Sequence, residues 1–261
     1  NVFVRGLGGR YNSTTLNGLP LPSEDPEYKN ISLDFFGSDL IETVDINKVF
    51  NSELTGDNAG ANINIDLKGL TDRDALEVGV STGANLQTVG EDFKSIDGGS
   101  FFGFTSPDLP VDNLRQYSFE NNINSQDQNG LANLGLSING GKRFDIGDNY
   151  LNVYGLLTFN NGYRFVDGTV RNTTSAGTEY LNQDFVSYEY ETSQIAQIDL
   201  DYRFNGNKIE FLSMYIHKNS QDFQEFQGID NPEQTGDMVF VRRQQTNNNN
   251  LFVNQLLTEF N

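Results

Sequence analysis

The 261-residue chain has no cysteine and only one histidine, His217. Without cysteine it can form neither a disulfide framework nor a thiolate metal site. A histidine-based catalytic triad or zinc site would rest on His217 alone, so we interpret this residue as a surface or lumen histidine in a strand. We therefore expect no metal site, no cofactor and no enzymatic activity.

Basic residues are also scarce. The chain has 17 Lys and Arg against 36 Asp and Glu, which gives a formal net charge of −19. Nucleic-acid binding needs clustered Lys and Arg to neutralise phosphates, so the composition argues against a nucleic-acid partner. No hydrophobic run approaches the roughly 20 residues of a membrane-spanning helix. A soluble protein and a β-barrel remain, because a barrel places its apolar residues at alternate positions.

The first residues alternate as in a short strand and run into a segment with three glycines, Gly6, Gly8 and Gly9. Glycine allows backbone paths that other residues resist. The segment is not a dinucleotide-binding loop, because the third glycine of that fingerprint would fall at Tyr11 and no helical pattern follows. It is not a secretion leader either, and we expect any leader to lie upstream.

Four short motifs occur in a fixed order: Arg5-Gly6, Leu16-Asn17-Gly18, Ile41 to Ile46 and Gly60 to Ile65. Over residues 2–68, their order and spacing resemble the plug domain of TonB-dependent outer-membrane receptors. Two positions depart from the family pattern, since Asp45 replaces a glutamate and Ala61 a glycine. The resemblance implies an α+β plug domain, a location in the bacterial outer membrane, and energy-coupled uptake.

After a charged hinge at residues 71–74, apolar and polar residues alternate strictly. Leu76, Val78 and Val80, for example, are separated by Glu77 and Gly79. The same pattern recurs at residues 131–144, 149–165, 194–204, 207–218 and 249–261, although the faces of the last two segments are ambiguous. A period of two predicts β-strands. The lengths fit the roughly 9–11 residues of a tilted membrane strand.

The predicted connections between these strands alternate in length. Short turns lie at residues 145–148 and 205–207, whereas polar stretches at residues 88–130, 166–193 and 219–248 join the other strands. Outer-membrane barrels show this asymmetry, with short periplasmic turns and long outer loops. The loops of a soluble sandwich have no reason to alternate. We predict an all-β dominated fold: part of a transmembrane antiparallel β-barrel with an α+β plug domain.

We place the C-terminal half of the plug at residues 1–70 and the first barrel strands at residues 71–261. Six strands cannot enclose a folded plug, and plugged transporters need roughly 22. We therefore expect the chain to be an internal piece of a larger receptor. By resemblance, a segment upstream would couple the receptor to the TonB complex of the inner membrane.

Candidate ligand-binding residues lie in the glycine-rich segment and in the first long loop. They are Gly8, Gly9, Arg10, Tyr11, Asn12, Phe101, Phe102 and Phe104, with the loop from Pro20 to Glu24 beside them. Three phenylalanines in a polar loop usually pack against something. The plug, the barrel mouth, a ligand and a partner lipoprotein are the alternatives.

Two further groups of oxygen-bearing side chains have simpler interpretations. Asp199 and Asp201 share a polar strand face and could do acid–base chemistry, but a polar barrel interior also explains them. Residues 92–97, 222–237 and 247–250 are rich in Asn and Asp, which are calcium ligands. We interpret them as solvated outer loops.

The sequence therefore predicts a TonB-dependent receptor that takes up a scarce, large ligand such as a siderophore, an oligosaccharide or a peptide. Its expected partners are the TonB complex, outer-membrane lipids and, as a further candidate, a surface lipoprotein. The alternative is a receptor-like outer-membrane barrel that acts in assembly or adhesion without transport.

The family places a plug arginine near barrel glutamates, and a guanidinium can bind a carboxylate through two parallel hydrogen bonds. Arg5 and Glu77 are the candidate pair for this plug–barrel contact, and a solvated arginine is the alternative. We predict that charge reversal at Arg5 loosens the plug and raises the conductance of the receptor in planar bilayers. An unchanged conductance would contradict the pairing.

Overall fold

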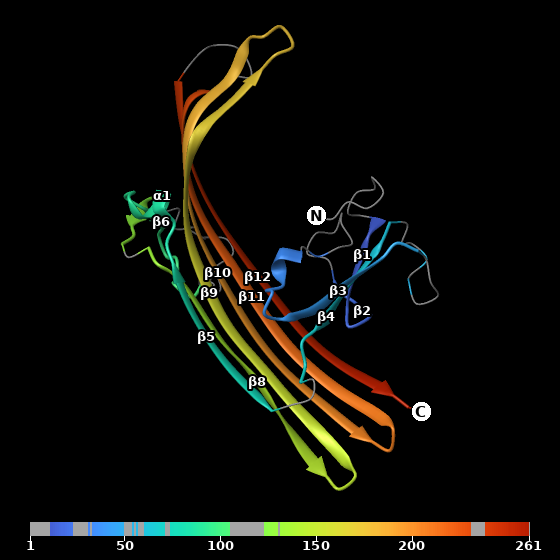
Figure 1. Ribbon diagram of the computed structural model, residues 1–261. Helices are drawn as coiled ribbons and strands as arrows, with labels where there is room; N and C mark the ends of the chain where they lie inside the picture. Colours follow the sequence, from blue (N-terminus) through green and yellow to red (C-terminus); the bar gives the residue numbers. More distant parts are fainter. Residues whose placement is uncertain are drawn as a thin grey trace, which may run out of the picture.

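The computed structural model describes residues 11–22, 31, 33–49, 54, 56, 60–70, 74–104, 123–129, 131–230 and 238–260 (Figure 1). A small sheet lies against the concave side of a large, curved sheet. Helical structure in this part of the chain is limited to the 3-10 turn η2 (Leu33–Phe35) and the four-residue helix α1 (Leu86–Val89). None of the described helices has the length and hydropathy needed to cross a bilayer. The predicted β-dominated fold is confirmed.

The small sheet has the strand order β2-β1-β4-β3. Its strands are β1 (Ser13–Leu16), β2 (Leu19–Pro20), β3 (Ile41–Asn47) and β4 (Asn62–Leu67). β1 runs parallel to β4, and the other neighbours are antiparallel. Asn17 and Gly18 join β1 to β2 with φ angles of 49° and 79°. Two successive residues with positive φ are typical of a type I′ hairpin turn, which explains the Asn-Gly pair.

The large sheet is an up-and-down antiparallel sheet with the order β12-β11-β10-β9-β8-β5. Its strands are β5 (Ala75–Gly83), β8 (Asn133–Ile146), β9 (Asn149–Thr173), β10 (Glu179–Phe204), β11 (Asn207–Asp230) and β12 (Met238–Glu259). The sheet is open, with β5 and β12 at its edges. Six strands in the predicted order, curved around a plug, fit part of a barrel wall.

Strands β9 to β12 are much longer than the sequence pattern predicted. β9 to β11 have 24 to 26 residues each, so the stretches 166–193 and 219–248 are mostly strand and not loop. Of these two stretches, residues 174–178 remain a connection, and residues 231–237 lie outside the described residues. The prediction was wrong here because apolar–polar alternation in these outer parts is confined to a few buried aromatic residues, such as Tyr188, Tyr190 and Phe223. The residues around them are polar, and their composition suggests a loop.

The two faces of the large sheet meet different partners. Directly paired residues of neighbouring strands share a face. In β10, Ile195 and Gln197 point to the concave side, and Gln194 and Ala196 point to the convex side. The faces of β11 had been ambiguous because both are apolar. Leu212, Met214 and Ile216 face the plug side, and Ile209 and Phe211 face outward.

Two separate cores result. The first lies on the concave face and joins the small sheet to β9–β12. The second lies on the convex face, where Phe93 is buried among tyrosines and phenylalanines of β9, β10 and β11. It is covered by a segment that we call the clasp: residues 84–104, 123–129 and 131, with α1, β6 (Lys94–Ile96) and β7 (Ser125–Asp127). α1 and β6 lie on the side of the large sheet opposite the plug (Figure 1).

Candidate functional site

The predicted ligand segment reaches the described structure at Tyr11 and Asn12. Tyr11 is exposed, whereas Asn12 is buried and its Oδ1 accepts a hydrogen bond from the Ala61 backbone N–H at 3.0 Å. A Cβ on Gly60 would lie 2.2 Å from the same oxygen, so this site requires glycine. Asn12 therefore holds the start of β4. Arg5, Gly8, Gly9 and Arg10 lie outside the described residues, and their roles stay predictions.

Buried side-chain amides of the large sheet bind backbone carbonyls of the small sheet. Gln197 Nε2 donates to the Lys68 carbonyl at 2.8 Å, and Gln255 Nε2 donates to the Leu16 carbonyl at 2.9 Å. Asn17 Nδ2 in turn donates to Gln255 Oε1 at 3.0 Å. Both glutamines are buried. A backbone carbonyl is a fixed acceptor, so these bonds set the position of the plug sheet on the wall.

Apolar packing fills the space between these hydrogen bonds. The plug side contributes Leu16, Phe35, Phe36, Leu40 and Ile65, and the wall side contributes Leu156, Ile195, Met214, Ile216 and Leu251. Two glycines allow the closest approach. A Cβ on Gly37 would lie 2.9 Å from Ile195 Cδ1, and one on Gly69 would lie 2.8 Å from Asp199 Oδ2.

The wall under the plug is nevertheless polar. Gln197 Oε1 and Asp199 Oδ1 are buried with no hydrogen-bond partner among the described residues. Asp201 pairs with Arg203 on the same face at 3.1 Å. A buried polar atom without a partner costs about 1–3 kcal/mol, so the interface holds the plug less firmly than an apolar core of equal size would.

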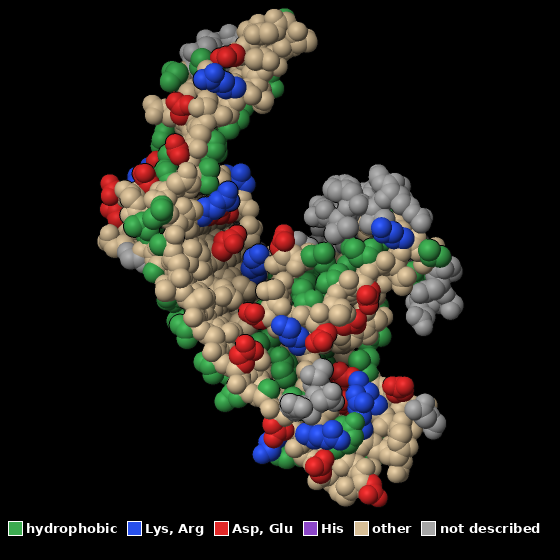
Figure 2. Space-filling model, in the orientation of Figure 1, with side chains coloured by type: hydrophobic (Ala, Val, Ile, Leu, Met, Phe, Trp, Pro, Cys, Tyr) green, Lys and Arg blue, Asp and Glu red, His purple; other side chains and the backbone are tan. Residues whose placement is uncertain are grey.

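A polar cleft opens where the plug and the wall diverge. It consists of adjoining hollows of about 250 and 430 Å³ that share Phe35 and Asn249. The other lining residues are Pro22, Ile31, Asp34, Glu191, Lys218, Ser220, Asn247, Asn248, Asn250 and Leu251. These wall residues lie farther from the short turns than the plug contacts do. Figure 2 shows the molecule hollowed between the plug and the far ends of the long strands. The sequence analysis missed most of this cleft, because η2 and three strands far from it in the chain, β10 to β12, form most of it.

Acidic residues lie on the concave face beyond the cleft. Burial, and after it the charges of Glu189 and Glu191, raise the pKa of the Asp222 carboxyl above its ordinary value, while Arg243 opposes the shift. Glu189 also forms an ion pair with Arg164 at 3.0 Å. No group of three or more His, Cys, Asp or Glu residues in the described ranges is arranged to hold a metal ion.

The other predicted site residues lie elsewhere on the wall. Glu77 is on the concave face of β5, where Asn139 Nδ2 donates to its carboxylate at 3.2 Å. Phe101, Phe102 and Phe104 pack on the convex face of β9 to β11, opposite the plug. A ligand contact of these phenylalanines stays a prediction, and it would concern the outer face of the wall.

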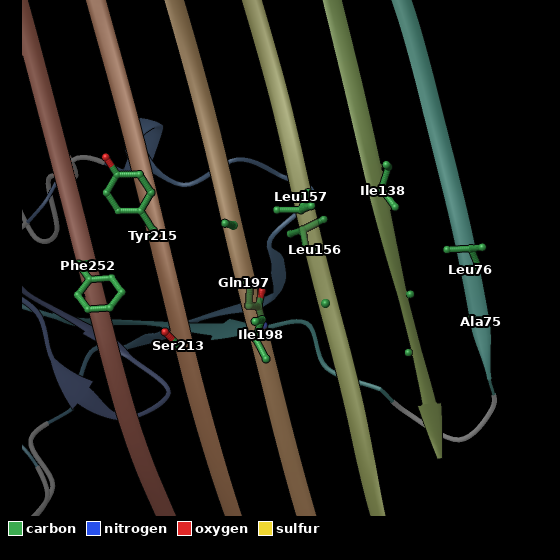
Figure 3. A pocket seen from close by; sticks show the side chains of 14 residues that line it. Ala75, Leu76, Ile138, Leu156, Leu157, Gln197, Ile198, Ser213, Tyr215 and Phe252 are labelled. Atoms are coloured by element: carbon green, nitrogen blue, oxygen red, sulfur yellow. The ribbon is translucent and has the colours of Figure 1, made fainter. Parts of the chain in front are cut away.

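The convex face carries a band of exposed apolar residues next to the short turns. It includes Leu76, Val78, Ile138, Leu157, Ile198, Phe211, Phe252 and Leu256. Within the band, Gly140, Gly155, Ala196 and Ser213 leave a hollow of about 560 Å³, which Figure 3 shows crossing neighbouring strands. Green side chains also follow this convex margin in Figure 2. The hollow opens away from the plug, on a surface suited to lipid acyl chains rather than to a transported ligand.

A plug sheet held inside a curved, up-and-down antiparallel wall with an apolar outer band defines the class of plugged β-barrel membrane proteins. Residues 1–62 match the family model of the TonB-dependent receptor plug domain. We therefore identify the chain as part of a TonB-dependent receptor. No curated protein and no solved structure matches it. The family consists of outer-membrane receptors that interact with TonB, which points to a receptor or transporter.

Removal of the Gln197 amide should loosen the plug next to Lys68. The Gln197→Ala variant leaves the Lys68 carbonyl without its partner, which costs about 1–3 kcal/mol and makes local opening about 5- to 160-fold more frequent. Trypsin cleavage after Lys68 should accelerate correspondingly in the folded receptor. Gln194→Ala is the matched control, because this glutamine is on the convex face of the same strand. Equal cleavage rates in the two variants would refute the role of Gln197.

Asp222 should reduce stability at neutral pH. Because its folded-state pKa is raised, the folded protein prefers the protonated form, and stability is lost as pH rises from the unfolded pKa of about 3.9 through the folded value. Asp222→Asn should therefore raise the free energy of unfolding at pH 7 by no more than about 1 kcal/mol, because water screens the site, and a higher unfolding temperature should report this gain. The gain should vanish near pH 3. Asp167→Asn, at an exposed position of the same sheet, should leave the unfolding temperature unchanged at both pH 7 and pH 3.

Proposed function

We propose that this protein is an energy-coupled outer-membrane transporter for a scarce, large ligand such as a siderophore, an oligosaccharide or a peptide. In this proposal, residues 1–70 act as the plug and residues 71–261 as part of the barrel wall. The observation that carries the proposal is the mixed plug–wall interface. Gln197 and Gln255 fix the plug through two backbone carbonyls, while neighbouring buried polar atoms lack partners.

Such an interface suits a plug that stays in place in the resting receptor and is displaced when energy is supplied. The hydrogen bonds give a defined position, and the net contribution of each is only about 0.5–1.5 kcal/mol. Mechanical pull by the TonB complex, the proposed energy-supplying partner, would need to break only a few of them. The ligand would first enter the polar cleft beside Phe35 and Asn249, with the segment from Gly8 to Asn12 as its candidate contact on the plug.

A second candidate is an assembly or adhesion component that transports nothing. The length of the outer strands favours it, since β10 has 26 residues and roughly 9–11 are enough to cross the membrane. The strand residues beyond the membrane would form a tall outer wall that another protein, including a surface lipoprotein, could contact. The two candidates differ in whether the plug contacts break when the cell supplies energy.

Thiol labelling in living cells separates the two candidates without knowledge of the ligand. These 261 residues contain no cysteine, so Asn17→Cys introduces their one thiol, at the contact with Gln255, in a receptor from which any cysteine elsewhere in the full chain is replaced by serine. For a transporter, maleimide labelling of this thiol in rich medium should be several-fold faster in TonB-competent cells than in cells that lack TonB. Glu42→Cys, on an exposed part of the plug, should label equally in both strains. Equal labelling of Asn17→Cys in the two strains would eliminate transport and leave the assembly role.

A further inference from the structure

The apolar band on the convex face has a measurable height. On β9 it runs from Leu151 to Phe159, eight residue steps of the strand. At about 3.3 Å per residue and a tilt of about 40°, this corresponds to roughly 20 Å along the membrane normal. Outer-membrane barrels carry an apolar band about 25 Å tall. The band therefore has room for one further layer of apolar side chains at its upper edge.

The upper edge of the band is sharp. Phe159, Gln194 and His217 are directly paired and form one row across β9, β10 and β11. The row below it contains Leu157 and Tyr215. Above it, the convex side chains are polar, with Asn161, Thr192, Asn219 and Asn248 on successive strands. The change from apolar to polar marks the level at which the outer leaflet ends.

The clasp is seated on this boundary row. Gln194 Nε2 donates to the Phe102 carbonyl at 2.9 Å, and the Tyr190 hydroxyl donates to the Phe101 carbonyl at 2.5 Å. The ring of Phe104 stacks on the imidazole of His217, with centroids 4.2 Å apart and planes 10° apart. Phe101, Phe102 and Phe104 of the clasp are thus bound to two neighbouring strands, β10 and β11.

Glycines bring the clasp backbone against the wall. Gly103 has a φ of +73°, and a Cβ there would lie 2.3 Å from Thr192 Oγ1. A Cβ on Gly99 would lie 2.2 Å from Gln221 Oε1. Farther from the membrane, Phe93 is buried in the second core and Thr88 Oγ1 accepts a hydrogen bond from the Phe165 backbone N–H at 3.0 Å. The clasp is therefore fixed along its length.

Within this fixed segment, the rings of Phe101 and Phe102 point into open space. They are 45% and 54% exposed, although their backbones are bound. Both rings contact the ring of Phe159, with centroid distances of 5.7 and 5.4 Å. Phe159 belongs to the apolar band, so the exposed rings continue the band outward from its upper row.

We propose that Phe101 and Phe102 insert into the outer leaflet of the outer membrane and that the clasp thereby fixes the depth of the barrel wall in the bilayer. The occupant of this surface is membrane lipid, because the rings are continuous with the lipid-facing band and lie at its upper limit. Insertion of an exposed ring into hydrocarbon removes apolar surface from water. A surface lipoprotein seated on the same rings is the competing occupant. The inference rests on the proposed function to the extent that the strands cross the outer membrane.

Tryptophan fluorescence tests the insertion directly, because these 261 residues contain no tryptophan and the emission of each variant is read as its difference from that of the unsubstituted receptor. Phe102→Trp and Phe101→Trp each replace one exposed ring by an indole. If one variant misfolds, the other still provides the test. The full-length receptor is reconstituted in vesicles of brominated phosphatidylcholine, with bromine either near the headgroup end or near the middle of the acyl chain. Leu157→Trp in the band is the embedded control. Leu86→Trp is the control on the clasp, because Leu86 is 90% exposed on α1, far from the boundary row.

We expect Phe102→Trp and Phe101→Trp to lose emission mainly to lipid brominated near the headgroups, and Leu157→Trp mainly to lipid brominated near the chain middle. Leu86→Trp should keep its emission in both. If Leu157→Trp is quenched and neither clasp variant is, the rings do not enter the leaflet, and a protein partner becomes their occupant. If Leu157→Trp is not quenched either, the wall does not cross the membrane, and the proposed function fails together with this inference.

Discussion

The uninterrupted antiparallel pairing of β9, β10 and β11 is the constraint on which the rest of the structure depends. From residue 181 to residue 203 of β10, every position has a partner on both neighbouring strands. Because side chains alternate along a strand, this register assigns each one to a single face. Ile195 packs against the plug, and Gln194, one residue earlier, binds the clasp. A shift by one residue would exchange the two environments and destroy both cores.

On the concave face, the plug is held in a specific position by contacts that are individually weak. A plug held only by apolar packing would slide easily, because such contacts are non-directional. Gln197 and Gln255 supply direction through bonds to backbone carbonyls, and Gly37 and Gly69 let the two sheets approach closely. The polar wall beside them limits the free energy gained by contact. This combination positions the plug through a few directional contacts.

The convex face shows how one strand can serve two environments along its length. Near the short turns its side chains are apolar and exposed, and beyond Phe159 they are polar or covered by the clasp. The clasp stabilises the outer part of the wall by burying Phe93 against Tyr163 and Tyr188, with ring centroids 5.4 Å from each. The large sheet therefore continues past the apolar band without leaving a wide aromatic surface in water.

The sequence by itself determined the features that depend on neighbouring residues. Period-two alternation identified the six wall strands, Asn-Gly pairs marked two of the turns, and four spaced motifs indicated the plug. Only the tertiary structure decided which face of β11 meets the plug, how far β10 extends into a stretch of mostly polar composition, and where Phe101, Phe102 and Phe104 pack. It also showed that Asn12 supports β4 and that the cleft forms around Phe35 and Asn249. These features require contacts between residues far apart in the chain, and local patterns carry no information about such contacts.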